Sequence, residues 1–267
     1  MTSTVVIRAL NNAVNSENEI HADGVARQHG FRGGLVPGVT VYAYMGGPVV
    51  DVLGPEWRQH GTMAARFVKP VYDGDEVTVS AAAVDDEEDG AAAAVSVVNR
   101  EGETCAVARA TVPALFRAPP DVGDYPQAPL PRPRPPANES TLAPGTVLGT
   151  IAERLVSEPQ PLIFAELGPQ FEVYLDDRAV DPVHLLRAAN AILAANVKLG
   201  PWLHVASEVT HFELAHEGDL FELRGRVADE FERKGHRFVT LDLLMLSGDD
   251  VPVQHVRHTA IHRLSGS

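Results

Sequence analysis

The sequence of 267 residues contains one cysteine, which excludes an internal disulfide. Cys105 lies in an alternating, strand-like stretch, and we interpret it as a buried thiol, because free cysteine usually packs as a small apolar side chain. The absence of a disulfide framework is typical of a reducing compartment. The first residues, Met1-Thr2-Ser3-Thr4, have neither the basic region nor the apolar core of a secretion signal. Together these features predict a cytoplasmic protein.

Basic residues are few compared with acidic ones, 22 against 36, for a formal net charge of −14. Nucleic-acid binding needs a basic face, so we expect no nucleic-acid partner, and an anionic membrane surface would repel the chain. The longest apolar run, Val36 to Leu53, is broken by Gly46, Gly47 and Pro48, so no stretch resembles the ~20 apolar residues of a membrane span. A small anionic ligand is still compatible with this charge, since a few arginines can hold its phosphates.

Proline is concentrated in one segment, Ala118 to Pro144, which has almost no apolar periodicity. Proline removes amide donors and favours an extended spacer, so we interpret this segment as a surface linker and not as a ligand for a proline-binding module. The sequence therefore predicts an N-terminal domain of residues 1–117, a linker of residues 118–145 and a C-terminal domain of residues 146–267.

The two halves echo each other. Leu53-Gly54-Pro55 and Leu199-Gly200-Pro201 lie 146 positions apart, and Gly74-Asp75 and Gly218-Asp219 lie 144 positions apart. A spacing that is nearly constant over this distance indicates an internal duplication.

Each copy is predicted to begin with an apolar helix, within Val36–Leu53 in the first copy and over Pro182–Leu199 in the second. Alternating segments separated by turn residues follow and predict antiparallel strands, whose single apolar face the helix would cover. The predicted strands are Thr62–Val68, Glu76–Val84, Ala91–Asn99, Cys105–Val112, Val205–Phe212, Leu220–Val227, Arg237–Leu246 and Val253–Arg263. Their turns are Asp73-Gly74, Asp89-Gly90, Glu101-Gly102, Glu217-Gly218 and Gly248-Asp249.

The stretch from Asn15 to Gly38 carries the candidate chemistry. Asp23 is expected to be the N-cap of a short helix, Gly24–His29, which Gly30 closes, and this places His21 on an ordered loop. Gly33-Gly34 then turns the chain into the long helix, whose first amides, around Gly38, have no acceptor within the helix. A histidine beside such donors is suited to proton transfer next to a thioester carbonyl.

This stretch resembles the MaoC-like, or (R)-specific enoyl-CoA hydratase, branch of the hot-dog fold. Asn18, Ile20, His21 and Asp23 match the family motif in register, and Arg66 to Val71 with Gly74-Asp75 resembles its strand-and-turn signature. The resemblance implies a tandem (double) hot-dog of the α+β class, in which each copy is an antiparallel sheet wrapped around one long helix. It also implies an acyl-CoA or acyl-carrier-protein substrate, a role in fatty acid metabolism, and no cofactor.

Ser16 is the main departure, because it stands where the family has its catalytic aspartate. The resemblance gives His21 the proton transfer, Ser16 and Asn18 the positioning of water or substrate, and Gly38 the polarisation of the carbonyl. Arg32 and Gly34 are candidate substrate-binding residues, and Arg27 is a further candidate for coenzyme A phosphates. For His21, a hydrogen-bonded loop residue is the alternative, and for Arg32 and Arg27 a solvated surface role. The small polar residue that sometimes supports the family site falls at about Gly46.

The second copy has no equivalent loop, since Tyr174 to Val180 precedes its helix, and we interpret His184 as a helix-end or packing residue. Several histidines invite a metal interpretation, but without a His-x-x-x-His helix or a cysteine partner we expect no metal site. They are His204, His211, His216, His255, His258 and His262.

The leading hypothesis is an enoyl-CoA hydratase or dehydratase relative, that is, a lyase. An acyl-CoA thioesterase and a non-catalytic acyl-thioester-binding protein are the alternatives. The acyl chain length, the carrier (coenzyme A or a carrier protein) and the oligomeric state stay open. A double hot-dog already contains the paired unit that single-domain relatives build by dimerising, and a homodimer of the whole chain is the alternative to a monomer.

Overall fold

The strands of both halves form a single antiparallel sheet of ten strands within the residues that the computed structural model describes, 1–85, 90–155 and 178–265. Their order is β1-β3-β4-β5-β2-β7-β10-β9-β8-β6. The first half supplies β1 (Thr2–Arg8), β2 (Thr62–Phe67), β3 (Glu76–Val84), β4 (Ala91–Asn99) and β5 (Thr104–Val112). The second half supplies β6 (Ile151–Arg154), β7 (Leu203–His211), β8 (Leu220–Arg233), β9 (His236–Ser247) and β10 (Val251–Arg263).

The two halves join where β2 pairs with β7, in a register that runs from Thr62 opposite Thr210 to Arg66 opposite Ala206. All eight predicted strands are present, because their alternation reflects one buried face. Two edge strands, β1 and β6, were not predicted. The predicted strand Leu220–Val227 was too short. It continues as β8 to a turn at Lys234 and Gly235, which both have positive φ.

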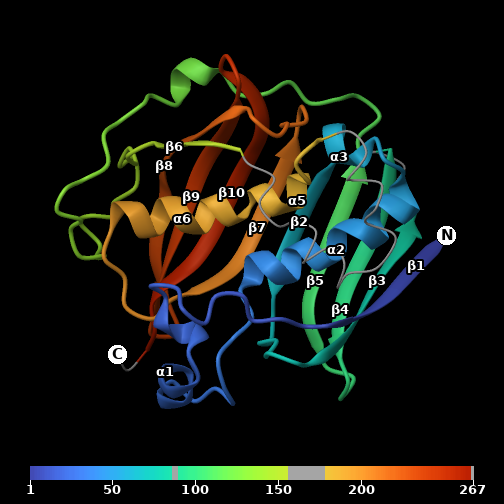
Figure 1. Ribbon diagram of the computed structural model, residues 1–267, viewed down its shortest axis with the longest axis horizontal. Helices are drawn as coiled ribbons and strands as arrows, with labels where there is room; N and C mark the ends of the chain where they lie inside the picture. Colours follow the sequence, from blue (N-terminus) through green and yellow to red (C-terminus); the bar gives the residue numbers. More distant parts are fainter. Residues whose placement is uncertain (86–89, 156–177, 266–267) are drawn as a thin grey trace.

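The helices α2 (Gly38–Leu53), α5 (Pro182–Leu185) and α6 (Arg187–Asn196) cross the same face of the sheet, as Figure 1 shows. The predicted second helix, Pro182–Leu199, is therefore two segments and ends at Asn196, because Val197 is extended. In the first copy, a Cβ on Gly46 would lie 3.0 Å from a methyl of Val183, so this glycine allows α5 to approach α2 closely. Each helix packs on its own half of the sheet, which is the predicted double hot-dog.

Four shorter helices complete the described elements: η1 (Glu19–His21), α1 (Asp23–Gln28), α3 (Trp57–His60) and η2 (Val122–Asp124). Cys105 is 1% exposed, as expected of a structural thiol. Two features of the sequence reach outside the described residues: Asp89 of the predicted Asp89-Gly90 turn, and Tyr174–Asp177 before the second helix.

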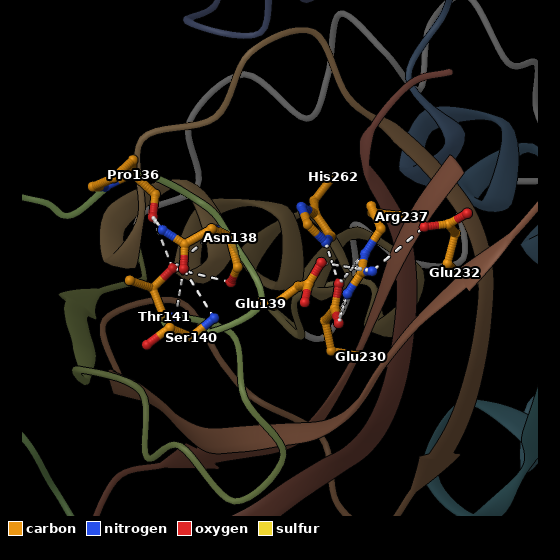
Figure 2. Close-up of polar contacts among 9 residues, drawn as sticks. All are labelled: Pro136, Asn138, Glu139, Ser140, Thr141, Glu230, Glu232, Arg237 and His262. Atoms are coloured by element: carbon orange, nitrogen blue, oxygen red, sulfur yellow. Dashed lines mark hydrogen bonds and ion pairs between the residues drawn. The ribbon is translucent and has the colours of Figure 1, made fainter. Parts of the chain in front are cut away.

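The proline-rich segment lies on the surface but is anchored to the second half (Figure 1). The buried hydroxyl of Tyr125 donates to Asp242 at 3.0 Å, and Glu139 pairs with Arg237 at 2.7 Å. Figure 2 shows that Arg237 also pairs with Glu230, which accepts from His262 at 2.9 Å. In the same view, the side chains of Asn138 and Thr141 close a turn through the carbonyl of Pro136.

Candidate active site

The loop that carries His21 is held by its own backbone and by the segment that leads into α2. The Asn11 side chain donates to the His21 carbonyl at 2.8 Å. A Cβ on Gly34 would lie 2.1 Å from that same carbonyl oxygen, so only glycine allows the two segments to pack this closely. Gly34 therefore positions the histidine loop, and it lines neither of the two cavities that His21 lines.

The predicted cap of the short helix was wrong. The helix α1 begins at Asp23, and its N-cap is Ala22. The Asp23 carboxylate instead accepts from the Gly34 amide at 2.8 Å and pairs with Arg27 at 2.8 Å. It thereby ties α1 to the segment before α2, and Gly30, at φ 83°, follows the helix as expected.

The hydrogen bonds of His21 define its tautomer. Its Nδ1 lies 2.7 Å from the Leu35 carbonyl, which can only accept, so Nδ1 carries the proton. The other ring nitrogen, Nε2, is then an acceptor and lies 3.3 Å from the side-chain amide of Asn18. The imidazole is 8% exposed, and this burial lowers its pKa more than the carbonyl hydrogen bond raises it. His21 is therefore a neutral base at neutral pH.

Asn18 connects the two halves of the chain. Its amide nitrogen donates to the Trp202 carbonyl at 3.0 Å as well as to His21, and its oxygen accepts from the amides of Trp202 and Ile20. These contacts use both protons and both lone pairs of the side chain. Asn18 thus orients the histidine and has no further capacity for a ligand in this arrangement.

Two cavities meet at His21. The larger has a volume of about 710 Å³ and lies between the His21 loop, α2 and α6. The smaller, of about 280 Å³, extends under the start of α2 toward β2 and β7 and is mostly apolar. Five residues line both of them: Asn18, His21, Pro37, Asn190 and Trp202.

The amino end of α2 borders the smaller cavity, as the sequence predicted. Gly38, its first residue, lines this cavity together with His21, and the amides of a first helical turn have no acceptor within the helix. A Cβ on Gly38 would lie 2.7 Å from Nδ1 of His204, so a larger residue would collide with the second half of the molecule. His204 stacks on His258 with ring centroids 4.1 Å apart, and both rings contact the Ser207 hydroxyl.

Of the other predicted site residues, Ser16 lines a cavity and the two arginines do not. Ser16 lines the larger cavity, and its hydroxyl donates to the Asn18 carbonyl at 3.4 Å. Arg32 pairs with Asp75 at 2.5 Å and stacks on Tyr72, while Arg27 pairs with Asp23. Neither arginine lines a cavity that contains His21.

No local pattern predicted the basic residues that the linker and the second half bring to the larger cavity. Arg134 from the linker pairs with Glu17 at 2.8 Å, which lowers the pKa of that carboxyl, and Arg187 and Lys198 line the same cavity. His184 also lines it, and burial lowers its pKa to about 4.

The histidines considered as metal ligands have protein partners. His255 pairs with Asp242 at 2.6 Å and His262 with Glu230 at 2.9 Å. Within the described ranges, no group of three or more His, Cys, Asp or Glu side chains is arranged to hold a metal ion.

No family model and no curated protein matches the sequence. Solved structures do match the fold. A conserved hypothetical protein from Mycobacterium tuberculosis with a double hotdog fold has a TM-score of 0.67 at 15% identity, over 98% of this chain and 95% of that one. A MaoC-like dehydratase has a TM-score of 0.62 at 10% identity, over 98% of both chains. An acyl-CoA thioesterase II from Mycobacterium marinum has a TM-score of 0.53 at 14% identity, over 88% of this chain and 92% of that one.

The fold is therefore a double hot-dog, shared with both dehydratases and thioesterases. None of the helices in the described part of the chain is long and apolar enough to cross a membrane.

Proposed function

We propose that the chain acts on acyl thioesters as an enoyl-CoA hydratase or dehydratase, with His21 as the base. The observation that carries this proposal is the position of one buried, neutral imidazole. Its Nε2 accepts, and the ring lies where two cavities meet beside the amino end of α2. A base and a set of amide donors within one enclosed site are the requirements for adding water next to a thioester carbonyl.

Hydration can be written with these groups alone. His21 Nε2 takes a proton from water as the water oxygen bonds to the β-carbon of the enoyl chain. The electron pair of the double bond moves onto the thioester oxygen, where the α2 amides around Gly38 stabilise the negative charge. The imidazolium then returns its proton to the α-carbon, and dehydration is the reverse.

The two cavities suit the two ends of such a substrate. The smaller one has apolar walls, including Val36, Phe67 and Ile261, for the acyl chain. The larger one carries Arg134, Arg187 and Lys198 for the phosphates of coenzyme A or of a carrier-protein arm. In this proposal these three side chains take the role first assigned to Arg32 and Arg27, which line neither cavity.

Ser16 favours a second candidate, thioester hydrolysis. A serine cannot supply the carboxylate that the resemblance places at this position, and hydrolysis needs only one base and an oxyanion site. His21 would then deprotonate a water that attacks the carbonyl carbon, and the thiol would leave.

The test is a panel of enoyl-CoAs from crotonyl to dodecenoyl, followed by loss of the enoyl absorbance, and a parallel panel of saturated acyl-CoAs, followed by release of free thiol. We expect His21→Gln to lower kcat by about 10²- to 10⁴-fold, the usual contribution of a general base. His29→Gln is the matched control, because this histidine follows α1 and lines neither cavity.

Equal turnover in His21→Gln and wild type would contradict the proposal. Release of free thiol would establish the hydrolase instead, because hydration leaves the thioester intact. Acyl-CoA-induced melting shifts without turnover of either panel would identify a binding protein.

A further inference from the structure

The second copy contributes an asparagine to the junction of the two cavities. Asn190 lies in the middle of α6 and is one of the five residues that line both cavities with His21. Its side-chain oxygen is buried and accepts no hydrogen bond within the part of the chain that the structure describes. A buried acceptor without a donor is destabilising, so the position calls for a donor that the described part of the chain does not provide.

The other groups at the junction do not donate to Asn190 Oδ1, and none offers a free acceptor to a ligand. Asn18 has already used its hydrogen-bonding capacity on Trp202, His21 and Ile20. The Pro37 carbonyl accepts from the amides of Thr40 and Val41, and an indole ring has no acceptor. Ser16 lines only the larger of the two cavities, and its hydroxyl donates to the Asn18 carbonyl. The one open acceptor among the five junction residues is therefore Asn190 Oδ1, and His21 Nε2 becomes available to water when its long 3.3 Å contact with the Asn18 amide opens.

We infer that Asn190 holds the reacting water together with His21, an inference that rests on the proposed function. Water has two protons: one goes to His21 Nε2 and the other points to Asn190 Oδ1. This leaves a lone pair of the oxygen for the substrate carbon. When the first proton transfers to His21, the second stays on the new hydroxyl and keeps its bond to Asn190. Asn190 thereby supplies the second acceptor that Ser16 does not.

The duplication supports this division of labour. The repeat marker at the helix ends has an offset of 146, which pairs Asn190 with Tyr44 of the first-copy helix. Tyr44 lines only the larger cavity, whereas Asn190 lines both. The second copy thus provides a polar group to the site of the first.

The experiment compares Asn190→Leu and Asn190→Asp in the full-length chain, using whichever water-consuming reaction the wild type performs. We expect Asn190→Leu to lower kcat by about 10- to 100-fold, the equivalent of one such hydrogen bond, with the affinity for a non-reacting acyl-CoA changed by less than about threefold. Asn190→Asp keeps an acceptor and should retain most of kcat. Its negative charge should raise the pKa of His21, so the acid limb of the pH profile should move to higher pH.

Asn15→Leu is the matched control, because Asn15 is exposed and lines neither cavity. Wild-type kcat in Asn190→Leu, or an unchanged acid limb in Asn190→Asp, overturns the role of Asn190 while the proposed function stands. A wild type that turns over neither panel overturns both, so the two failures are distinguishable.

Discussion

At the scale of single residues, two opposing effects set the pKa of His21. Burial disfavours its charged form, and the hydrogen bond to the Leu35 carbonyl favours it, with burial the stronger. The resulting pKa lies below the ordinary value of 6.5. A base must be deprotonated to act, so activity should rise with pH through this lowered pKa, and the midpoint of the rise should lie below the ordinary value of 6.5.

A pH profile of kcat/KM for the free enzyme measures this pKa directly. An acid limb with its midpoint above pH 7 would show that His21 is not the titrating base, or that it is charged in the free protein. The profile of the His29→Gln control should coincide with that of the wild type.

The local part of the site could be predicted from the sequence, and the rest could not. Asn18, His21 and Gly38 lie within 21 positions of one another, so loop and helix signals place them together. Asn190, Trp202 and Arg134 arrive from distant segments, and no local pattern says which remote side chain meets which cavity. Arg27 was wrongly considered for coenzyme A phosphates although its partner could have been predicted locally, because Asp23 lies four residues away in the same helix.

At the scale of elements, the alternation of apolar and polar residues correctly predicted strands wherever one strand face is buried. It did not reveal β6, which has only four residues, or β1, an edge strand whose Thr-Val-Val-Ile run of β-branched residues could have been recognised. The second helix was predicted too long because Val197 and Leu199 continue its apolar pattern, although both lie beyond its end at Asn196. The Asn196 side chain bonds Gly149 and Ile192, so it acts as a buried polar connection.

The linker's attachment to the second half predicts unequal effects of two substitutions. Tyr125→Phe removes a buried hydrogen bond to the Asp242 carboxylate, and we expect the free energy of unfolding to fall by about 1–3 kcal/mol. Glu139→Gln removes an ion pair whose carboxylate is 66% exposed, and it should leave stability within the error of the measurement. Urea unfolding of both variants tests this ranking, and an equal loss in the two would show that the Tyr125 contact is not a stabilising anchor.

At the scale of the whole molecule, the two copies are not independent units. The His21 loop belongs to the first copy, yet Trp202 holds Asn18 in place, His204 packs on Gly38, and α6 forms one side of the larger cavity. The β2–β7 pairing makes these contacts part of one continuous sheet. The candidate site is therefore a property of the assembled pair of hot-dogs.

The burial of several histidines makes the stability of the whole molecule sensitive to acid. Burial lowers the pKa of His184 to about 4 and those of His211 and His258 to about 3. Below pH 6.5 these three side chains are protonated in the unfolded chain but not in the folded chain. The free energy of unfolding therefore decreases as the pH is lowered. Asp181 acts in the opposite direction, because burial raises its pKa to about 7 and the folded chain then binds a proton that the unfolded chain releases above about pH 4. Burial also lowers the pKa values of His21, His204 and His262, which act in the same direction as these three. The net effect is a loss of at least the amount that the three histidines and Asp181 give.

Each buried histidine should contribute about 2 kcal/mol of this loss at pH 5, and Asp181 should offset about one of the three. We therefore expect the free energy of unfolding in urea to be on the order of 2–4 kcal/mol lower at pH 5 than at pH 7. In His258→Gln this difference should shrink by about 2 kcal/mol, because one of the three groups no longer titrates. The exposed His216→Gln variant should keep the full difference. Equal stability of the wild type at the two pH values would mean that these rings accept protons without unfolding, and that the packing between the halves is looser than their burial implies.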